Sequence, residues 1–116
     1  MAKQEKIYID AIDHFISKNY YKSSELLRKF LDYNSKHHVA YNLLGLSFYL
    51  SNNNNLAIKN FNKAIDLNPN NVDYLLNLAR VYVQINDTNE AKKILNKSIS
   101  LNPKELKLYR ELASLL

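Results

Sequence analysis

The stretch from Tyr41 to Pro69 contains a pattern that recurs later in the chain. Its order is an aromatic residue, Leu-Gly, a second aromatic residue, then Ala, Phe, Ala and Pro: Tyr41, Leu44, Gly45, Phe48, Ala57, Phe61, Ala64 and Pro69. A shift of 34 residues moves Ala57 onto Ala91 and Pro69 onto Pro103. Self-similarity at a fixed period of this length is the sequence signature of a solenoid built from helix pairs.

Three units of this length cover most of the chain, and the first is the least regular. It has Asp10 and His14 at the positions equivalent to Leu44 and Phe48. A terminal repeat is expected to be atypical because one of its sides meets water instead of a neighbour. Apolar residues still recur at helical spacing in it, so we expect a helix pair there too. The predicted units are about 4–37, 38–71 and 72–105.

The pattern starts a fourth time after Pro103 and stops halfway. Its positions lie 34 residues after those of the third unit: Tyr109, Leu112, Ala113 and Leu116. We expect this single helix, about 104–116, to cover the apolar end of the third unit. Asn102, Pro103 and Glu105 form a plausible beginning for it.

Taken together, these positions resemble the tetratricopeptide repeat family over nearly the whole chain. The resemblance is most specific in the second and third units. It implies an all-α, right-handed superhelical solenoid of antiparallel helix pairs, with three tetratricopeptide repeats, a C-terminal capping helix and seven helices in a single domain of residues 1–116. The composition agrees, since one Gly and two Pro leave little material for β-turns.

Composition also limits where the protein is expected to work and what chemistry it carries. The chain has no Cys, which excludes disulfides and thiolate metal sites. It has no apolar run near the roughly 20 residues of a membrane span, and its beginning lacks the apolar core of a signal peptide. We therefore expect a cytoplasmic protein with no membrane span.

Catalytic and metal-binding patterns are missing from the sequence. There is no Cys nucleophile, a single Gly does not permit a glycine-rich phosphate loop, and no acidic pair with a neighbouring His occupies an apolar face. His37 and His38 are adjacent and point apart, and His14 lies a full unit upstream. We expect no enzyme activity, no catalytic residue, no cofactor and no metal.

In the family that the chain resembles, one face of each first helix lines a concave groove. At about 100° per residue, that face is opposite the packing positions. We expect a peptide or amphipathic helix of another protein, apolar with acidic residues, to bind there, although Ile12 and Leu46 have the alternative of packing between neighbouring helices. The candidate groove residues are Tyr8, Ile12, Phe15, Asn42, Leu46, Tyr49, Asn77, Arg80, Lys107 and Arg110.

A subclass of the family grips the C-terminal carboxylate of chaperone peptides with Lys, Asn and Arg side chains. The matching positions here do not reproduce that set: Tyr8, Ile12, Leu43, Asp73 and Asn77. Such residues do not neutralise a carboxylate. We therefore do not expect a chaperone-tail clamp.

Two other surfaces suggest alternative partners. The second helices carry a basic row, Lys29, Lys63 and Lys97, in a chain of net charge +5. We do not expect nucleic-acid binding there, because the row lacks interleaved aromatic residues and Arg is scarce. The alternative to peptide capture is self-association or assembly through the C-terminal helix, or a place in a longer solenoid. It rests on four apolar residues: Leu106, Leu108, Leu115 and Leu116.

Overall fold

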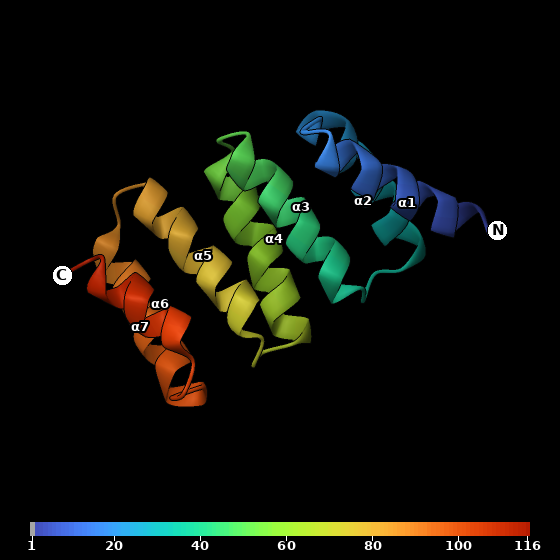
Figure 1. The fold of residues 1–116 in the computed structure, drawn as a ribbon. Coiled ribbons are helices and arrows are strands. Elements are labelled where there is room, and N and C mark those ends of the chain that lie inside the picture. The colour runs from blue at the N-terminus through green and yellow to red at the C-terminus, as the bar shows by residue number, and fades with distance from the viewer. Residues whose placement is uncertain (1) are drawn as a thin grey trace.

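The computed structural model describes residues 2–116, and most of them are helical (Figure 1). Within this range there are seven α-helices and no strands, as predicted. The helices are α1 (Lys3–Ile16), α2 (Tyr20–Tyr33), α3 (His38–Leu50), α4 (Asn54–Leu67), α5 (Val72–Gln84), α6 (Thr88–Leu101) and α7 (Leu106–Ala113).

Helices adjacent in sequence pair as hairpins, and the hairpins stack in chain order from one end of the molecule to the other (Figure 1). The pairs are α1 with α2, α3 with α4, and α5 with α6, while α7 packs against α6. The stack measures 46 × 25 × 20 Å. This is the predicted solenoid of antiparallel helix pairs with an additional helix at its C-terminal end.

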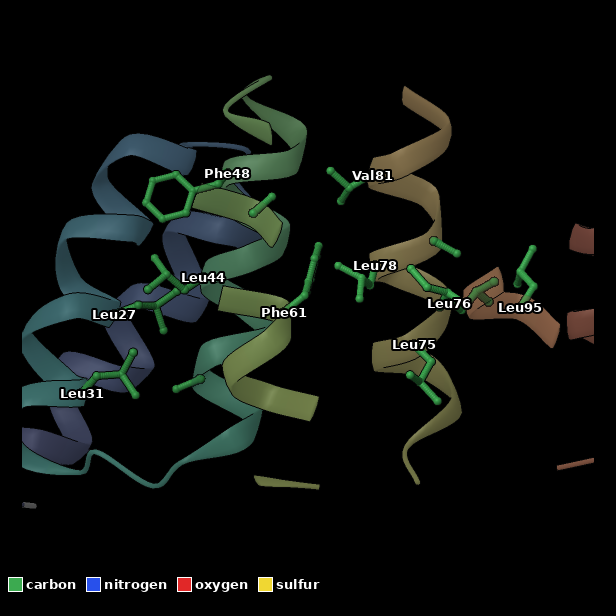
Figure 2. Close-up of a cluster of buried hydrophobic side chains, with 14 of the residues drawn as sticks. Leu27, Leu31, Leu44, Phe48, Phe61, Leu75, Leu76, Leu78, Val81 and Leu95 are labelled. Atoms are coloured by element: carbon green, nitrogen blue, oxygen red, sulfur yellow. The ribbon is translucent and has the colours of Figure 1, made fainter. Parts of the chain in front are cut away.

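A close helix crossing lies at the centre of the second hairpin. A Cβ atom added at Gly45 would lie 2.6 Å from Cδ1 and Cε1 of the Phe61 ring, which is fully buried between α3 and α5 (Figure 2). Only glycine leaves room for the ring at this crossing. The other two hairpins place a buried Ala opposite a buried Leu at the equivalent positions: Ala11 with Leu27, and Ala79 with Leu95.

The turn inside each hairpin uses the same left-handed residue position three times. Lys18, Asn52 and Asn86 have φ values of 63°, 63° and 66°. In the first turn the amide of Asn19 donates to the His14 carbonyl (2.8 Å), and that of Lys18 donates to the Phe15 carbonyl (3.0 Å). This pair of bonds is the Schellman motif, which satisfies the last carbonyls of a helix. The other two turns repeat both bonds.

The residue after each left-handed position also begins the next helix. The side chains of Asn19 and Asp87 accept from the amides of Lys22 (3.4 Å) and Glu90 (3.1 Å). Asn53 is the N-cap residue in the middle turn, without a side-chain bond. Because the residue that completes the C-terminal motif is also the N-cap residue of the following helix, the two helices of a hairpin are joined with almost no loop.

The first hairpin has a serine, Ser23, at a position where the other two hairpins have alanine. Ser23 occupies the small position held by Ala57 and Ala91, and it is fully buried. Its hydroxyl donates to the Ala11 carbonyl across the helix pair, at 2.9 Å. A buried hydroxyl that finds a carbonyl avoids the cost of an unpaired polar group, so serine works here in place of alanine.

The C-terminal helix differs from the sequence-based expectation in two ways. It begins at Leu106, after Pro103 and Lys104, with Glu105 at the N-cap and no side-chain bond there. Leu108 was expected to add exposed apolar surface, but it is fully buried in the core. The apolar exposure of this end comes instead from Leu106 and Leu116, which are 65% and 89% exposed.

From the Gly45–Phe61 crossing we predict that the effect of Gly45→Ala on stability changes sign with the residue at position 61. Gly45→Ala gains about 1 kcal/mol of helix propensity, but overpacking a core costs about 1–3 kcal/mol. We expect the substitution to lower stability in the parent chain. In a Phe61→Leu background it recreates the Ala–Leu pair of the other hairpins, so we expect it to raise stability. Urea unfolding of the four proteins measures both effects.

The same double-mutant cycle contains its own control, because the alanine is identical in both backgrounds. An equal effect of Gly45→Ala in the parent chain and in the Phe61→Leu background would show that the ring does not limit the crossing.

Candidate peptide-binding face

Side-chain hydrogen bonds tie α3 to α5 across one face of the solenoid. Nδ2 of Asn77 donates to Oδ1 of Asn42 at 2.9 Å. The Tyr74 hydroxyl and Nδ1 of His38 are hydrogen-bonded at 2.7 Å. Both bonds join the first helices of successive hairpins, and we call the surface that α1, α3, α5 and α7 form the first-helix face.

Ion pairs continue these links from α5 to α7. Nη2 of Arg80 lies 2.8 Å from Oε1 of Glu111, and Lys107 pairs with Asp73. The hydrogen bond that Lys107 donates to the Asp73 carboxylate raises the pKa of Lys107. All four side chains remain substantially solvent-accessible, so each pair is worth at most about 1 kcal/mol.

These pairs change the expected charge of the C-terminal half. From the sequence, Arg80, Lys107 and Arg110 make this half basic. The structure gives the first two an acidic partner, whereas Arg110 is exposed and makes no ion pair within residues 2–116. The excess positive charge offered to a ligand is therefore concentrated at Arg110.

The N-terminal half of this face is apolar. Asn42, Leu46 and Tyr49 are spaced four and three residues apart, so they lie on one side of α3. The bond of Asn42 to Asn77 shows that this side is the first-helix face. Leu46 and Tyr49 are half-buried against the core. Each therefore contributes to packing and also presents part of its surface to solvent.

Tyr8 occupies the position on α1 that is equivalent to Asn42 on α3, and it belongs to an aromatic cluster. Its ring centroid lies 4.6 Å from that of Phe30 and 5.0 Å from that of His37. Burial raises the pKa of the Tyr8 hydroxyl. Beside the cluster is a hollow of about 470 Å³, lined also by Ile9 and Asn34.

The remaining two candidates on α1 are less clearly available. Ile12 and Phe15 are both half-buried. The Phe15 ring packs edge-on against Tyr20, with centroids 5.6 Å apart, so part of it is used inside the first hairpin.

Sequence reasoning did not predict the links that organise this face: His38 with Tyr74, Arg80 with Glu111, and Lys107 with Asp73. A usable signal was present, because the linked residues lie 31 to 36 residues apart, close to one repeat length. Polar residues separated by about one repeat on first helices are candidates for such links.

Two observations concern other kinds of site. Among residues 2–116, His, Asp and Glu side chains do not gather in a group of three that could hold a metal ion. None of the described helices combines the length and the apolar character needed to cross a bilayer.

Comparison with known proteins identifies the architecture. A family model described as "Tetratricopeptide repeat" matches residues 48–116. The chain belongs to the tetratricopeptide repeat family. No match was found among curated proteins.

Solved structures share the tetratricopeptide fold along most of the chain. MamA is 22% identical, with a TM-score of 0.89 over 97% of this chain and 66% of that one. The first repeat domain of Spaghetti (RPAP3), solved with the HSP90 peptide SRMEEVD, is 17% identical, with a TM-score of 0.86 over 97% and 90%. A chain of the CopN–Scc3 complex is 19% identical, with a TM-score of 0.84 over 97% and 66%.

These identities show a shared fold. The chain spans 57 to 66% of the length of the MamA structures that it matches, which include one from Desulfovibrio magneticus RS-1.

His37 makes the stability of this tetratricopeptide domain sensitive to pH. Its Nδ1 accepts from the Ala40 amide at 3.0 Å and caps α3, which requires that nitrogen to be unprotonated. Burial, with a smaller effect of neighbouring His38, lowers the pKa of His37 below 6.5. The folded state thus favours neutral His37. The stability that the His37 cap contributes is complete above about pH 6.5 and is lost as the pH falls through the folded-state pKa.

We expect His37→Asn, which copies the capping Asn71 of the next hairpin, to reduce the loss of stability between about pH 7.5 and pH 5 by roughly 0.5–1 kcal/mol, the lower range of an N-cap. Denaturant unfolding of both proteins at the two pH values measures this. The two proteins differ only at residue 37. The same pH dependence in both would contradict the capping role.

Proposed function

We propose that this chain is a non-enzymatic protein–protein interaction module of the cytoplasm, a scaffold that binds a peptide or amphipathic helix of a partner protein on its first-helix face. Family membership supports the general role. The observation that carries the proposal is the row of half-buried Leu46 and Tyr49 beside the Asn42–Asn77 link. Three repeats, about 4–37, 38–71 and 72–105, would form this face together as a single domain of residues 1–116.

The ligand proposed for this face has two parts. Apolar side chains would bury the exposed portions of Tyr8, Leu46 and Tyr49, as an amphipathic helix or extended segment does in an apolar groove. An acidic residue would meet Arg110, the cation of this face without an ion pair in residues 2–116. The Arg80–Glu111 and Lys107–Asp73 pairs would stay intact as the wall of the site. A ligand carboxylate that displaced Glu111 or Asp73 would only exchange one ion pair for another.

The HSP90 peptide in the Spaghetti structure, SRMEEVD, has three acidic residues among its last four, but the residues of the present chain argue against the same mode of binding. Asp73 lies at the C-terminal end of the face and pairs with Lys107. A terminal carboxylate placed there would meet like charge. An internal segment of a partner fits this face better than a free C-terminus.

Self-association is the second candidate, and exposed leucines at the C-terminal end favour it. Leu106 and Leu116 are 65% and 89% exposed, and Tyr109 beside them is 42% exposed. Apolar surface of this kind is a common feature of interfaces between copies of a chain. Sedimentation at increasing protein concentration would accompany the binding measurements, so that dimer formation is not mistaken for peptide binding.

The binding face can be tested with peptides selected from a random library displayed on phage. We expect some of the selected peptides to lose about fivefold to tenfold in affinity on Tyr49→Ala and on Arg110→Glu. Tyr49→Ala removes buried contact and acts on dissociation, whereas Arg110→Glu reverses a charge at the rim and acts mainly on association. Surface plasmon resonance separates the two rates.

Two substitutions on second helices serve as controls. Tyr33→Ala removes an exposed aromatic ring from α2, and Lys97→Glu reverses an exposed charge on α6. Thermal melts identify any loss of folding in Tyr49→Ala, whose ring also packs against the core. If every selected peptide is equally sensitive to the control and the test substitutions, the first-helix face is not the binding surface.

A further inference from the structure

The opposite side of the solenoid contains a groove between α2 and α4, floored by α3. It encloses about 600 Å³. The floor is apolar and includes Leu44, Phe48 and Leu56. A second hollow of about 380 Å³ shares Phe48 and Leu56 with the first and extends it to Tyr20 and Tyr21 near the beginning of α2. We call this continuous space the α2–α4 groove.

The rim of the groove carries an excess of positive charge. Arg28, Lys59 and Lys63 line it, against two carboxylates, Asp32 and Glu25, of which Glu25 lies 3.8 Å from Nζ of Lys22. Within residues 2–116 none of these three cations forms an ion pair. They are therefore free to pair with a ligand without breaking an existing ion pair.

Two of these cations are held over the groove by aromatic rings. The Arg28 guanidinium lies 5.0 Å from the ring centroid of Phe48, and Nζ of Lys63 lies 5.4 Å from that of Tyr41. A cation–π contact at an exposed site is worth about 0.5–1 kcal/mol. The cation–π contacts therefore hold the charged groups of Arg28 and Lys63 above the apolar floor of the groove.

The next interval, between α4 and α6, does not repeat this arrangement. Lys93 and Lys97 are equivalent to Lys59 and Lys63, but Asn62 replaces Arg28 and Glu90 replaces Leu56. The second interval keeps a carboxylate at Asp66, equivalent to Asp32, and has Lys59 at the position equivalent to Glu25. The cation Arg28 and the apolar Leu56 are thus particular to the first interval.

Hydrogen-bond acceptors on the walls indicate which class of macromolecule fits. Asn60 is 6% exposed, and its Nδ2 donates to the Leu56 carbonyl at 2.8 Å, which leaves Oδ1 as the acceptor. Asp32 and Ser35 add further acceptors. A peptide backbone supplies N–H donors for them, whereas the phosphates of a nucleic-acid backbone accept hydrogen bonds and do not donate them.

From this charge, floor and wall chemistry we propose that the α2–α4 groove is a second, separate docking site for an acidic peptide segment of a partner protein. Its carboxylates would pair with Arg28, Lys59 and Lys63, and an apolar side chain would pack on Leu44, Phe48 and Leu56. The site lies on second helices and does not depend on the first-helix face. A chain with both sites would hold two segments at once.

The test uses roughly twelve-residue random peptides displayed on phage, selected on the intact chain and counter-selected on the Arg28→Glu/Lys63→Glu double variant. We expect the surviving peptides to be rich in Asp and Glu and to contain an aromatic or aliphatic residue. Their affinity, measured by fluorescence anisotropy, should fall at least about tenfold in the double variant and in the milder Arg28→Gln. It should change less than about twofold in Lys97→Glu, the matched charge reversal one repeat away.

Two outcomes would overturn the proposal. One is the failure of counter-selection to leave any acidic peptide, with the double variant shown to be folded by its circular dichroism. The other is a fluorescein-labelled single-stranded or duplex DNA of similar length that binds more tightly than the peptides and loses affinity in the double variant but not in Lys97→Glu. Neither outcome affects the first-helix face, whose peptides are identified by their sensitivity to Arg110→Glu.

Discussion

The structure depends on how closely the two helices of each hairpin approach at one crossing. At Gly45 there is room for the Phe61 ring only because a Cβ atom is missing. A glycine inside a helix costs about 1 kcal/mol relative to alanine, and the buried aromatic ring offsets this with its large apolar surface. The ring reaches across to α5, as Figure 2 shows. The spacing within one hairpin thereby positions the next, and with it the first-helix face.

Turn geometry contributes the second constraint. Three left-handed residues without glycine would each be unfavourable in isolation, yet each is held by two backbone bonds and is followed by a capping position. The three hairpins therefore share the same turn geometry. Regular stacking places polar residues that are about one repeat apart within bonding distance, which is how Asp73 reaches Lys107.

Much of this organisation was predictable, because the positions that pack are also the positions that recur every 34 residues. The helix pairs and the place of Asn42 and Asn77 on one face follow from this periodicity. The burial of Leu108 and the pairing of Arg80 with Glu111 do not follow from it. They depend on where α7 comes to lie on α5 and α6. The α2–α4 groove was also missed, since it arises from differences between repeats, such as Asn60 for Ile94.

The three crossings also have a consequence for pairing specificity. A chain of similar units is liable to pair a helix with the wrong partner, in the same molecule or in another copy, and such misassembly is a known failure of repeat proteins. Here the second hairpin has a Gly–Phe pair, whereas the first and third hairpins share an Ala–Leu pair. If α1 met α4, the Ala11 methyl group would clash with the Phe61 ring; if α3 met α6, Gly45 opposite Leu95 would leave a void. The different pair in the middle thus disfavours register-shifted pairings that involve the second hairpin.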